Sequence, residues 1–425
     1  MPISGEGALQ KLICALVVVL ASTSPGRADV LHLQHGVGLH EWLNWSPLAE
    51  DGSYRWPPYR SEDEWLGQDR PLSDWPEGDV FEGIRALGFD FIRLSVDPGP
   101  LLASEGARRQ EALAVLSKAV ERITAAGLKV VFDLHSVTQV PEYGTELLNS
   151  GADSDGIARY ESVAADVARM LVAIGTDRTA IEPYNEPAYY PCDAGGSDDW
   201  QRIMTTTVRA IRAVSADLTI VATGACGGSI TGLTDLDPHF DDSNIYYSFH
   251  MYEPHSFTHQ RLDDPQAFAS GLPWPADKGS RDVVIATLEA RMAAAGLTAE
   301  QQAADIAAIS GTIDDYFREN WGPAQLDARI GEAVAWAGQH GIPTDRLFMG
   351  EFGAMLMSPD GRSGAFDADR LRYLTAVRKE AERFNIPWSI WEYSNPYGMS
   401  VIEPQGPAVP DTKLLGALGL DQKAQ

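Results

Sequence analysis

The chain has 425 residues, of which 44% are hydrophobic and 22% charged, and its formal net charge at pH 7 is −27. Such a composition is ordinary for a globular protein. The negative charge argues against a nucleic-acid partner, because phosphate binding needs clustered Lys and Arg. A neutral, polyhydroxyl substrate suits this charge better than an anionic one.

The first residues, 1–28, are predicted to be a secretory signal peptide. Lys11 precedes the apolar run Leu12–Ala21, and small residues follow as far as Ala28. The run is too short to cross a bilayer, so we expect cleavage and export to the periplasm or the medium. An uncleaved N-terminal anchor is the alternative. No later apolar run approaches membrane length, and no membrane association is expected after cleavage.

From residue 30 onward, apolar runs alternate with amphipathic stretches that have helical spacing. The expected elements, in chain order, are strand 31–39, helix 81–87, strand 89–96, helix 110–126, strand 128–134, helix 157–174, strand 180–184, helix 200–214, strand 218–223, strand 245–251, strand 346–350, helix 368–384, strand 387–391 and helix 413–418.

This alternation predicts a parallel sheet with right-handed crossovers. Eight strands over this length predict a closed (β/α)8 barrel, and we expect residues 29–425 to form one catalytic domain. An insertion follows the sixth strand, at about residues 253–340, with a loop-like start and three helical patterns at 283–295, 299–321 and 325–340. No Gly-rich phosphate loop follows the first strand, which argues against a nucleotide-binding fold.

Polar side chains gather where the strands end, and in such a barrel this edge forms the active-site face. Glu186 follows the fourth strand beside Asn185, and Glu351 follows the seventh strand. Two carboxylates can cleave a glycosidic bond, because one protonates the leaving oxygen while the other attacks the sugar carbon. Arg93 is expected to keep one carboxylate ionised, and Glu182 is expected to lie too deep to reach substrate. Further candidates at the strand ends are His40, Trp42, His135, His250, Tyr252 and Trp391.

This arrangement resembles glycoside hydrolase family 5, the cellulase family of retaining (β/α)8 barrels. The likeness extends from about residue 30 to residue 420, and it rests on an ordered set of residues rather than on one motif. In chain order the matching residues are Arg93, His135, Asn185-Glu186-Pro187, His250-Met251-Tyr252, Glu351-Phe352-Gly353 and Trp391.

The resemblance implies a role for each carboxylate. Glu186 would be the acid/base, and Glu351 the nucleophile that forms a covalent glycosyl-enzyme. For a retaining mechanism, the two carboxylates are expected about 5–5.5 Å apart. Tyr252 would contact Glu351, and Arg93 would keep that carboxylate ionised.

The resemblance also implies how a sugar is held. Asn185 would bind the sugar 2-hydroxyl, and Trp391 would form the floor of the subsite in which the ring is distorted. His135 and His250 would hold substrate hydroxyls and the acid/base network.

Aromatic residues elsewhere leave two interpretations open. They could pack over the barrel rim or serve as platforms for further sugar units, and Trp42 is the best single candidate for sugar contact. The loop at 254–275 should overhang the cleft and offers His255, His259 and Trp274 as sugar contacts. The N-terminal tryptophans are Trp42, Trp45, Trp56, Trp65 and Trp75.

No cofactor and no metal are expected. His32 and His35 are three residues apart, so both cannot point inward from one strand as the metal-binding barrels require. Cys192 and Cys226 follow the fourth and fifth strands, which are neighbours in a barrel. A disulfide between them is favoured over two free thiols in an exported protein.

The expected function is that of a monomeric endo-β-1,4-glucanase that acts on a β-glycan with retention. The alternatives are a β-mannanase, a β-1,3-glucanase or an enzyme that degrades an exopolysaccharide, because the catalytic set does not distinguish these substrates. A catalytically silent carbohydrate-binding barrel would need a lost carboxylate, and neither Glu186 nor Glu351 is lost.

Overall fold

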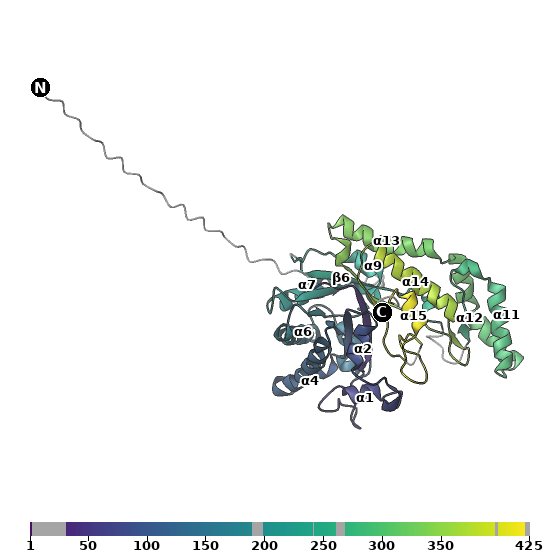
Figure 1. The fold of residues 1–425 in the computed structure, drawn as a ribbon, viewed down its shortest axis with the longest axis horizontal. Coiled ribbons are helices and arrows are strands. Elements are labelled where there is room, and N and C mark those ends of the chain that lie inside the picture. Colours follow the sequence, from purple (N-terminus) through teal and green to yellow (C-terminus); the bar gives the residue numbers. More distant parts are fainter. Residues whose placement is uncertain (2–30, 189–198, 241, 261–267, 396–397, 421–425) are drawn as a thin grey trace.

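The computed structural model describes Met1 and residues 31–188, 199–240, 242–260, 268–395 and 398–420. Its centre is a closed barrel of parallel strands, as predicted, in the order β1-β10-β8-β6-β5-β4-β3-β2 (Figure 1). The strands are β1 His35–Leu43, β2 Phe91–Val96, β3 Lys129–Leu134, β4 Thr179–Glu182, β5 Thr219–Thr223, β6 Ile245–Met251, β8 Leu347–Phe352 and β10 Trp388–Ile390.

Helices surround the barrel and bury its outer face. Those outside the insertion are α1 Glu62–Leu66, α2 Val80–Ala86, α3 Gly99–Leu102, α4 Gly106–Ala125, α5 Thr145–Leu148, α6 Asp155–Ile174, α7 Asp199–Arg212, α8 Ala225–Gly228, α9 Ile230–Asp235, α14 Asp367–Arg383 and α15 Thr412–Ala417. Among the described residues, no helix has the length and hydropathy needed to cross a bilayer.

The insertion after β6 begins with the short α10 His255–Thr258 and continues through α11 Arg281–Ala294, α12 Ala299–Glu319 and α13 Pro323–Gln339. Figure 1 shows α11 and α12 on the opposite side of the barrel from α4 and α6. A two-stranded sheet of β7 Ala269–Ser270 and β9 Ser363–Gly364 joins this region to the loop after β8. The three helical patterns expected in the insertion are confirmed.

The first strand begins later than predicted, at His35 rather than at residue 31. Leu31 and Leu33 instead pack among inward-facing barrel residues such as Phe91 and Phe348. The backbone of Leu31 is held by the side chains of Thr219 and Tyr246, at 2.9 Å each. Leu31 and Leu33 therefore fill part of the barrel interior and do not belong to the first strand.

Two other expectations concern residues beyond the described ranges. The proposed signal peptide lies almost wholly within residues 2–30 and so outside the described part of the chain. Cys226 is disulfide-bonded, whereas Cys192, its expected partner, is also outside the described residues.

Candidate active site

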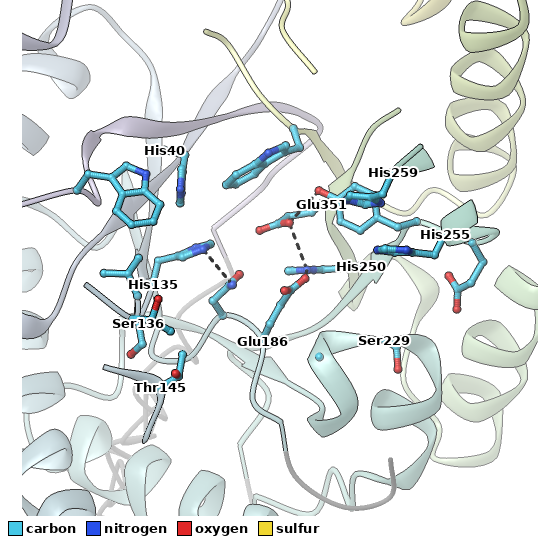
Figure 2. Close-up of a pocket in the computed structure, with 18 residues that line it drawn as sticks. His40, His135, Ser136, Thr145, Glu186, Ser229, His250, His255, His259 and Glu351 are labelled. Atoms are coloured by element: carbon cyan, nitrogen blue, oxygen red, sulfur yellow. Dashed lines mark hydrogen bonds and ion pairs between the residues drawn. The ribbon is translucent and has the colours of Figure 1, made fainter. Parts of the chain in front are cut away.

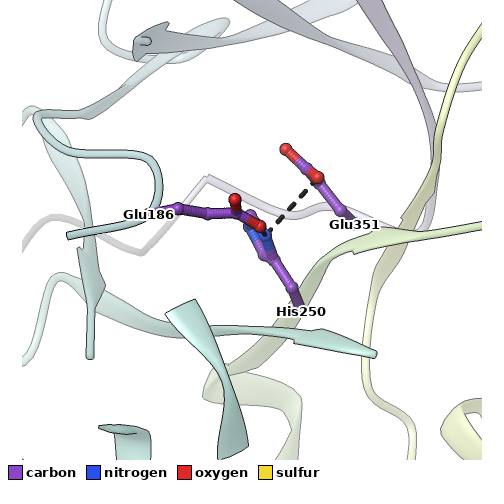
Figure 3. Close-up of side chains that lie close together, drawn as sticks. All are labelled: Glu186, His250 and Glu351. Atoms are coloured by element: carbon purple, nitrogen blue, oxygen red, sulfur yellow. Dashed lines mark hydrogen bonds and ion pairs between the residues drawn. The ribbon is translucent and has the colours of Figure 1, made fainter. Parts of the chain in front are cut away.

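Glu186 and Glu351 face each other across the mouth of the barrel (Figure 3). Glu351 belongs to β8, and Glu186 lies in the turn four residues beyond the end of β4. A carboxylate oxygen of Glu186 lies within 4.8 Å of a carboxylate oxygen of Glu351. That distance fits the separation of about 5–5.5 Å in retaining glycosidases and not the about 6.5–9.5 Å that leaves room for an attacking water.

His250 lies between the two carboxylates and contacts both. Its Nδ1 is 2.6 Å from Oε1 of Glu186 and 3.4 Å from Oε2 of Glu351. Burial alone would lower the pKa of His250, but the charges of Glu351 and Glu186 outweigh it and raise that pKa. The imidazole therefore carries a proton on Nδ1, from which it donates a hydrogen bond to Glu186.

The same three residues are close enough to hold a metal ion between one atom of each. In the structure, Nδ1 of His250 lies 2.6 Å from Oε1 of Glu186, a contact that suits proton transfer at this position.

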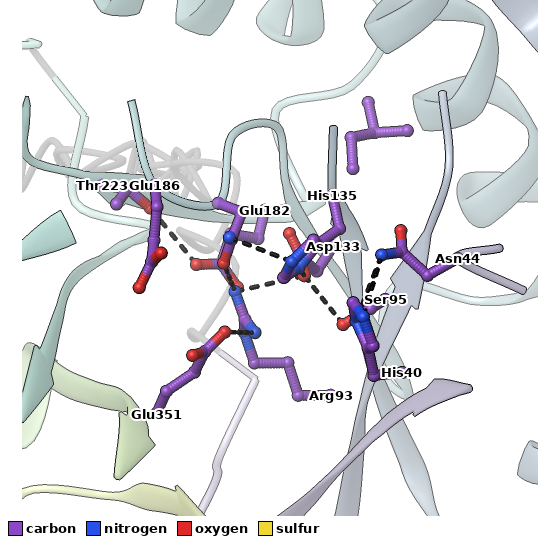
Figure 4. Close-up of polar contacts among 12 residues, drawn as sticks. His40, Asn44, Arg93, Ser95, Asp133, His135, Glu182, Glu186, Thr223 and Glu351 are labelled. Atoms are coloured by element: carbon purple, nitrogen blue, oxygen red, sulfur yellow. Dashed lines mark hydrogen bonds and ion pairs between the residues drawn. The ribbon is translucent and has the colours of Figure 1, made fainter. Parts of the chain in front are cut away.

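Arg93 anchors the floor of the site through every nitrogen of its guanidinium (Figure 4). The group is fully buried, with Nε 2.7 Å from Glu182 and Nη1 2.6 Å from Glu351. Nη2 donates to Oδ1 of Asn185 at 2.8 Å and lies 3.2 Å from Asp133. One rigid fork thus positions residues from β3, β8 and the end of β4.

The buried charges are arranged so that Glu351 stays ionised. Burial would raise the pKa of Glu351, but the nearby His250 and Arg93 lower it to about 2. Burial raises the pKa of Glu182, although Arg93 opposes that change. Glu182 is fully buried and cannot reach substrate, as predicted, and its oxygens accept hydrogen bonds from Arg93 and Thr223.

Asn185 is held in one orientation by a chain of hydrogen bonds. Its Oδ1 accepts from Arg93, so its Nδ2 must face Nε2 of His135, at 3.1 Å. Nδ1 of His135 in turn donates to Asp133 at 2.7 Å. Because Nε2 of His135 is then the acceptor, Asn185 keeps one N–H free to donate into the cleft. Both ring nitrogens of His135 have protein partners, so this residue acts through Asn185.

Tyr252 and Trp391 both line the cleft that contains Glu351. The Tyr252 hydroxyl donates to Oε2 of Glu351 at 2.9 Å. The ring of Trp391 lies 4.7 Å from the ring of His40 and 5.9 Å from that of His135, so it faces the cleft as expected. Burial and then His135 lower the pKa of His40, which stays neutral beside the sugar floor.

The prediction that Trp42 contacts sugar is wrong. Trp42 is buried, stacks on Trp65 at 5.3 Å and donates from its indole nitrogen to the carbonyl of Arg60. The register of β1 shifts between Leu39 and Leu43, so Trp42 does not share the inward face of His40. Trp45, three residues later, lines the cleft instead.

Trp274 is likewise buried and is not a sugar contact. It packs against Phe257 and Tyr373 beneath the loop. His255 and His259 do line the cleft, as expected. Burial distinguishes Trp274 from the two histidines that line the cleft, and the sequence alone does not show which side chains are buried.

The cleft around these residues has a volume of about 660 Å³. Figure 2 shows His40, His135 and Thr145 on one side of the carboxylates and His255 and His259 on the other. Sequence reasoning missed several polar wall residues, since they lie in the connections after the strands or at the starts of short helices, where no periodicity marks them. These are Ser136, Thr138, Thr145, Ser229 and Glu253.

A parallel barrel with two carboxylates at this separation at its mouth defines a glycoside hydrolase that acts with retention. The family model of the cellulases, glycosyl hydrolase family 5, matches residues 53–396. The chain belongs to this family.

Curated relatives agree with this membership. Endoglucanase 3 of Fibrobacter succinogenes is 30% identical over 290 residues, which are 68% of this chain and 40% of that protein. Cellodextrinase A of Ruminococcus flavefaciens is 26% identical over 185 residues, 43% of this chain and 53% of that protein. The chain thus matches about half or less of the length of these relatives.

Solved structures share the fold. The structure of endoglucanase Cel5A from Thermotoga maritima superposes with a TM-score of 0.61 at 17% identity, covering 91% of this chain and 96% of that one. A family 5 xyloglucanase from Paenibacillus pabuli gives a TM-score of 0.64 at 15% identity, covering 93% and 99%. The eight-stranded barrel predicted from the sequence is confirmed.

Proposed function

We propose that this chain is an endo-β-1,4-glucanase that hydrolyses its substrate with retention, with Glu351 as nucleophile and Glu186 as acid/base. The observation that carries the proposal is the carboxylate pair within 4.8 Å, with His250 bridging it. The resemblance to proteins named endoglucanases supports the choice of β-1,4-glucan.

In the first step, Glu351 attacks the anomeric carbon from one face of the sugar while the bond to the leaving oxygen breaks. Glu186 gives its proton to that oxygen, so the leaving chain departs as an alcohol and a glycosyl-enzyme ester remains. Arg93 and Tyr252 hold the attacking carboxylate as an anion and fix its direction. Preorganised donors of this kind need no rearrangement during the reaction.

In the second step, Glu186, now ionised, takes a proton from a water molecule that attacks the same anomeric carbon. The ester bond to Glu351 breaks, and the configuration at the carbon is restored. The Nδ1–H of His250 is 2.6 Å from Glu186, so it stabilises the carboxylate in the interval between the two proton transfers.

The sugar on the non-reducing side of the bond would rest on Trp391. The free N–H of Asn185 would donate to its 2-hydroxyl, a contact that strengthens as the sugar gains oxocarbenium character. The hydrogen-bond chain through Arg93 and His135 supports this role, because it leaves only one way for the amide to point.

We also propose that the enzyme is exported after removal of residues 1–28 and works as a monomer. The disulfide at Cys226 supports export, since structural disulfides persist mainly in oxidising compartments. Mass analysis of the protein recovered from periplasm and medium would locate the mature N-terminus, and light scattering would give the oligomeric state.

The test is hydrolysis of 4-nitrophenyl β-cellobioside and of a panel of β-glucans, β-mannan and xyloglucan. We expect release of nitrophenol, preferential cleavage of β-1,4-glucan, and a β-configured first product by NMR. Glu351→Ala should lose activity by several orders of magnitude, roughly as for other essential nucleophiles. A wild-type enzyme that cleaves none of these glycans would refute the proposal, and preference for mannan would reassign the substrate.

A further inference from the structure

A second cavity continues the active-site cleft toward the insertion. It has a volume of about 320 Å³ and shares Glu253 and His255 with the cleft. One of its walls is the loop after β6, and the other is α12 with the residues that follow it. The remaining lining residues are Pro254, Ser256, Thr312, Asp315, Tyr316, Glu319 and Trp321.

This cavity lies on the leaving-group side of the bond that breaks. Trp391 and Asn185, which would hold the sugar that is attacked, are packed with His135. Figure 2 places His135 on one side of the carboxylate pair and His255 on the other. A chain that crosses the carboxylates therefore leaves the site past His255, toward α12.

The first part of this path is walled by two parallel imidazole rings. His255 and His259 stack with centroids 4.1 Å apart and an interplanar angle of 9°. Burial and the neighbouring His255 lower the pKa of His259 to about 3, so its ring is neutral. Tyr252 contacts the ring of His259 edge-on, which holds the pair next to the nucleophile.

The second part of the path ends at Trp321. This indole is half-buried, and its nitrogen donates to Oε2 of Glu319 at 2.9 Å, which fixes the ring. Glu253 on the opposite wall is held by Arg329 of α13 at 2.9 Å. A fixed aromatic face beside oriented carboxylates matches a sugar ring, which has apolar C–H faces and a rim of hydroxyl donors.

We propose that the insertion builds a distal subsite for the leaving-group end of a neutral β-linked glycan, with Trp321 as the sugar platform and the His255–His259 pair as the connecting wall. The inference rests on the proposed glycanase function. It assigns a purpose to the insertion, whose described residues form no hydrogen bond or ion pair with the two catalytic carboxylates.

Trp321→Ala is the test, and Trp56→Ala is its matched control. Trp56 is also a half-buried indole that donates to a glutamate, Glu111, at 2.7 Å, but it does not line the cleft. Both variants and the wild type are assayed on 4-nitrophenyl β-cellobioside, which has no sugar on the leaving-group side, and on reducing-end-labelled cellohexaose.

We expect Trp321→Ala to lower kcat/KM on cellohexaose about tenfold, because the apolar area lost from one stacked sugar is worth about that factor. Its cleavage sites should also shift toward the reducing end, since fewer units are then held beyond the carboxylates. Activity on the aryl glycoside should stay within about twofold of wild type, as should both activities of Trp56→Ala.

Cleavage sites and kcat/KM on cellohexaose that are unchanged in Trp321→Ala would overturn the subsite while leaving the proposed function intact. Equal losses on both substrates would show a general structural effect and would overturn it as well. A wild type that is inactive on both substrates would refute the proposed function itself, and the subsite with it.

Discussion

Replacement of Arg93 by Lys keeps the positive charge but removes the forked geometry. The guanidinium contacts Glu351 at 2.6 Å, Glu182 at 2.7 Å, Asn185 at 2.8 Å and Asp133 at 3.2 Å. A lysine has one nitrogen on a shorter reach, so it can satisfy about two of these four groups. The other two remain buried without their donor.

The size of the effect follows from those lost contacts. A hydrogen bond to a buried charged group contributes about 1.5–3 kcal/mol, so losing two should lower the free energy of unfolding by about 3–6 kcal/mol. Removing one partner of a buried ion pair lowers the free energy of unfolding by a similar amount, about 3–5 kcal/mol. We expect Arg93→Lys to fold at low temperature but to melt well below the wild type.

The pH dependence gives a sharper readout. Glu351 must be ionised to attack, and its pKa of about 2 in the wild type keeps it ionised through the mildly acidic range. A weaker contact in Arg93→Lys should raise that pKa toward the ordinary value of about 4.3. The acid limb of kcat/KM should therefore move to higher pH.

The ionisation of Glu351 should also affect the stability of the folded protein. A carboxyl whose pKa is lowered by folding stabilises the folded state above its unfolded pKa, and this contribution is lost as pH falls through the folded pKa. For Glu351 the window runs from about pH 4.3 down to about pH 2. The difference in unfolding free energy between wild type and Arg93→Lys should thus become smaller as the pH falls through that window.

The measurements are chemical denaturation and kcat/KM on an aryl β-cellobioside from about pH 2 to about pH 8, a range that includes the pKa of Glu351. Arg109→Lys is the control, because Arg109 is also buried and bonded to Asp166 and to the carbonyls of Leu101 and Ser104. It should lose stability without a shift of the acid limb. An acid limb that stays in place in Arg93→Lys would refute the assigned role of Arg93.

Four further substitutions test the site and its surroundings. Trp42→Ala should lower the free energy of unfolding by about 3–5 kcal/mol, with little change in activity per folded molecule. Trp45→Ala should leave the melting temperature near that of the wild type but lower the activity on polymer. Calorimetry and reducing-sugar assays would distinguish the two effects. Gly350→Ala would place a Cβ 2.7 Å from Oγ of Ser248 and 3.3 Å from Nε2 of His250. Both side chains must then shift, and the displacement of His250 should lower kcat/KM at least about tenfold. Tyr252→Phe removes a 2.9 Å hydrogen bond to the nucleophilic carboxylate and should lower kcat/KM by about 10- to 100-fold. Wild-type kinetics in either of the last two variants would contradict the geometry described above.

Much of the fold was readable from the sequence because a barrel repeats one local pattern. Each strand is a short apolar run followed by an amphipathic helix, and that pattern needs no knowledge of distant residues. The candidate site was readable for a related reason. Strand ends of a parallel barrel all face one way, so Glu186, Glu351 and His250 could be expected to meet once the strands were placed.

Tertiary structure decided which side chains of similar character face the cleft. Trp42 was the better candidate for sugar contact in sequence, but it is buried beside a register shift in β1, and Trp45 lines the cleft instead. Glu182 ends β4 and Glu186 lies four residues further on, and of the two only Glu186 is exposed, with 39% of its side chain accessible. Exposure depends on what packs against a residue from elsewhere in the chain.

The electrostatics of the site also could not be predicted from the local sequence. Arg93 meets groups from three other strands or their ends. The pKa of His250 is raised by two carboxylates that are 64 and 101 residues away in the chain. The sequence by itself determined which strands carry the two carboxylates and the polar residues beside them. The closure of the barrel decided in which direction the pKa of each buried group moves, because pKa values depend on burial and on charges brought near only by folding.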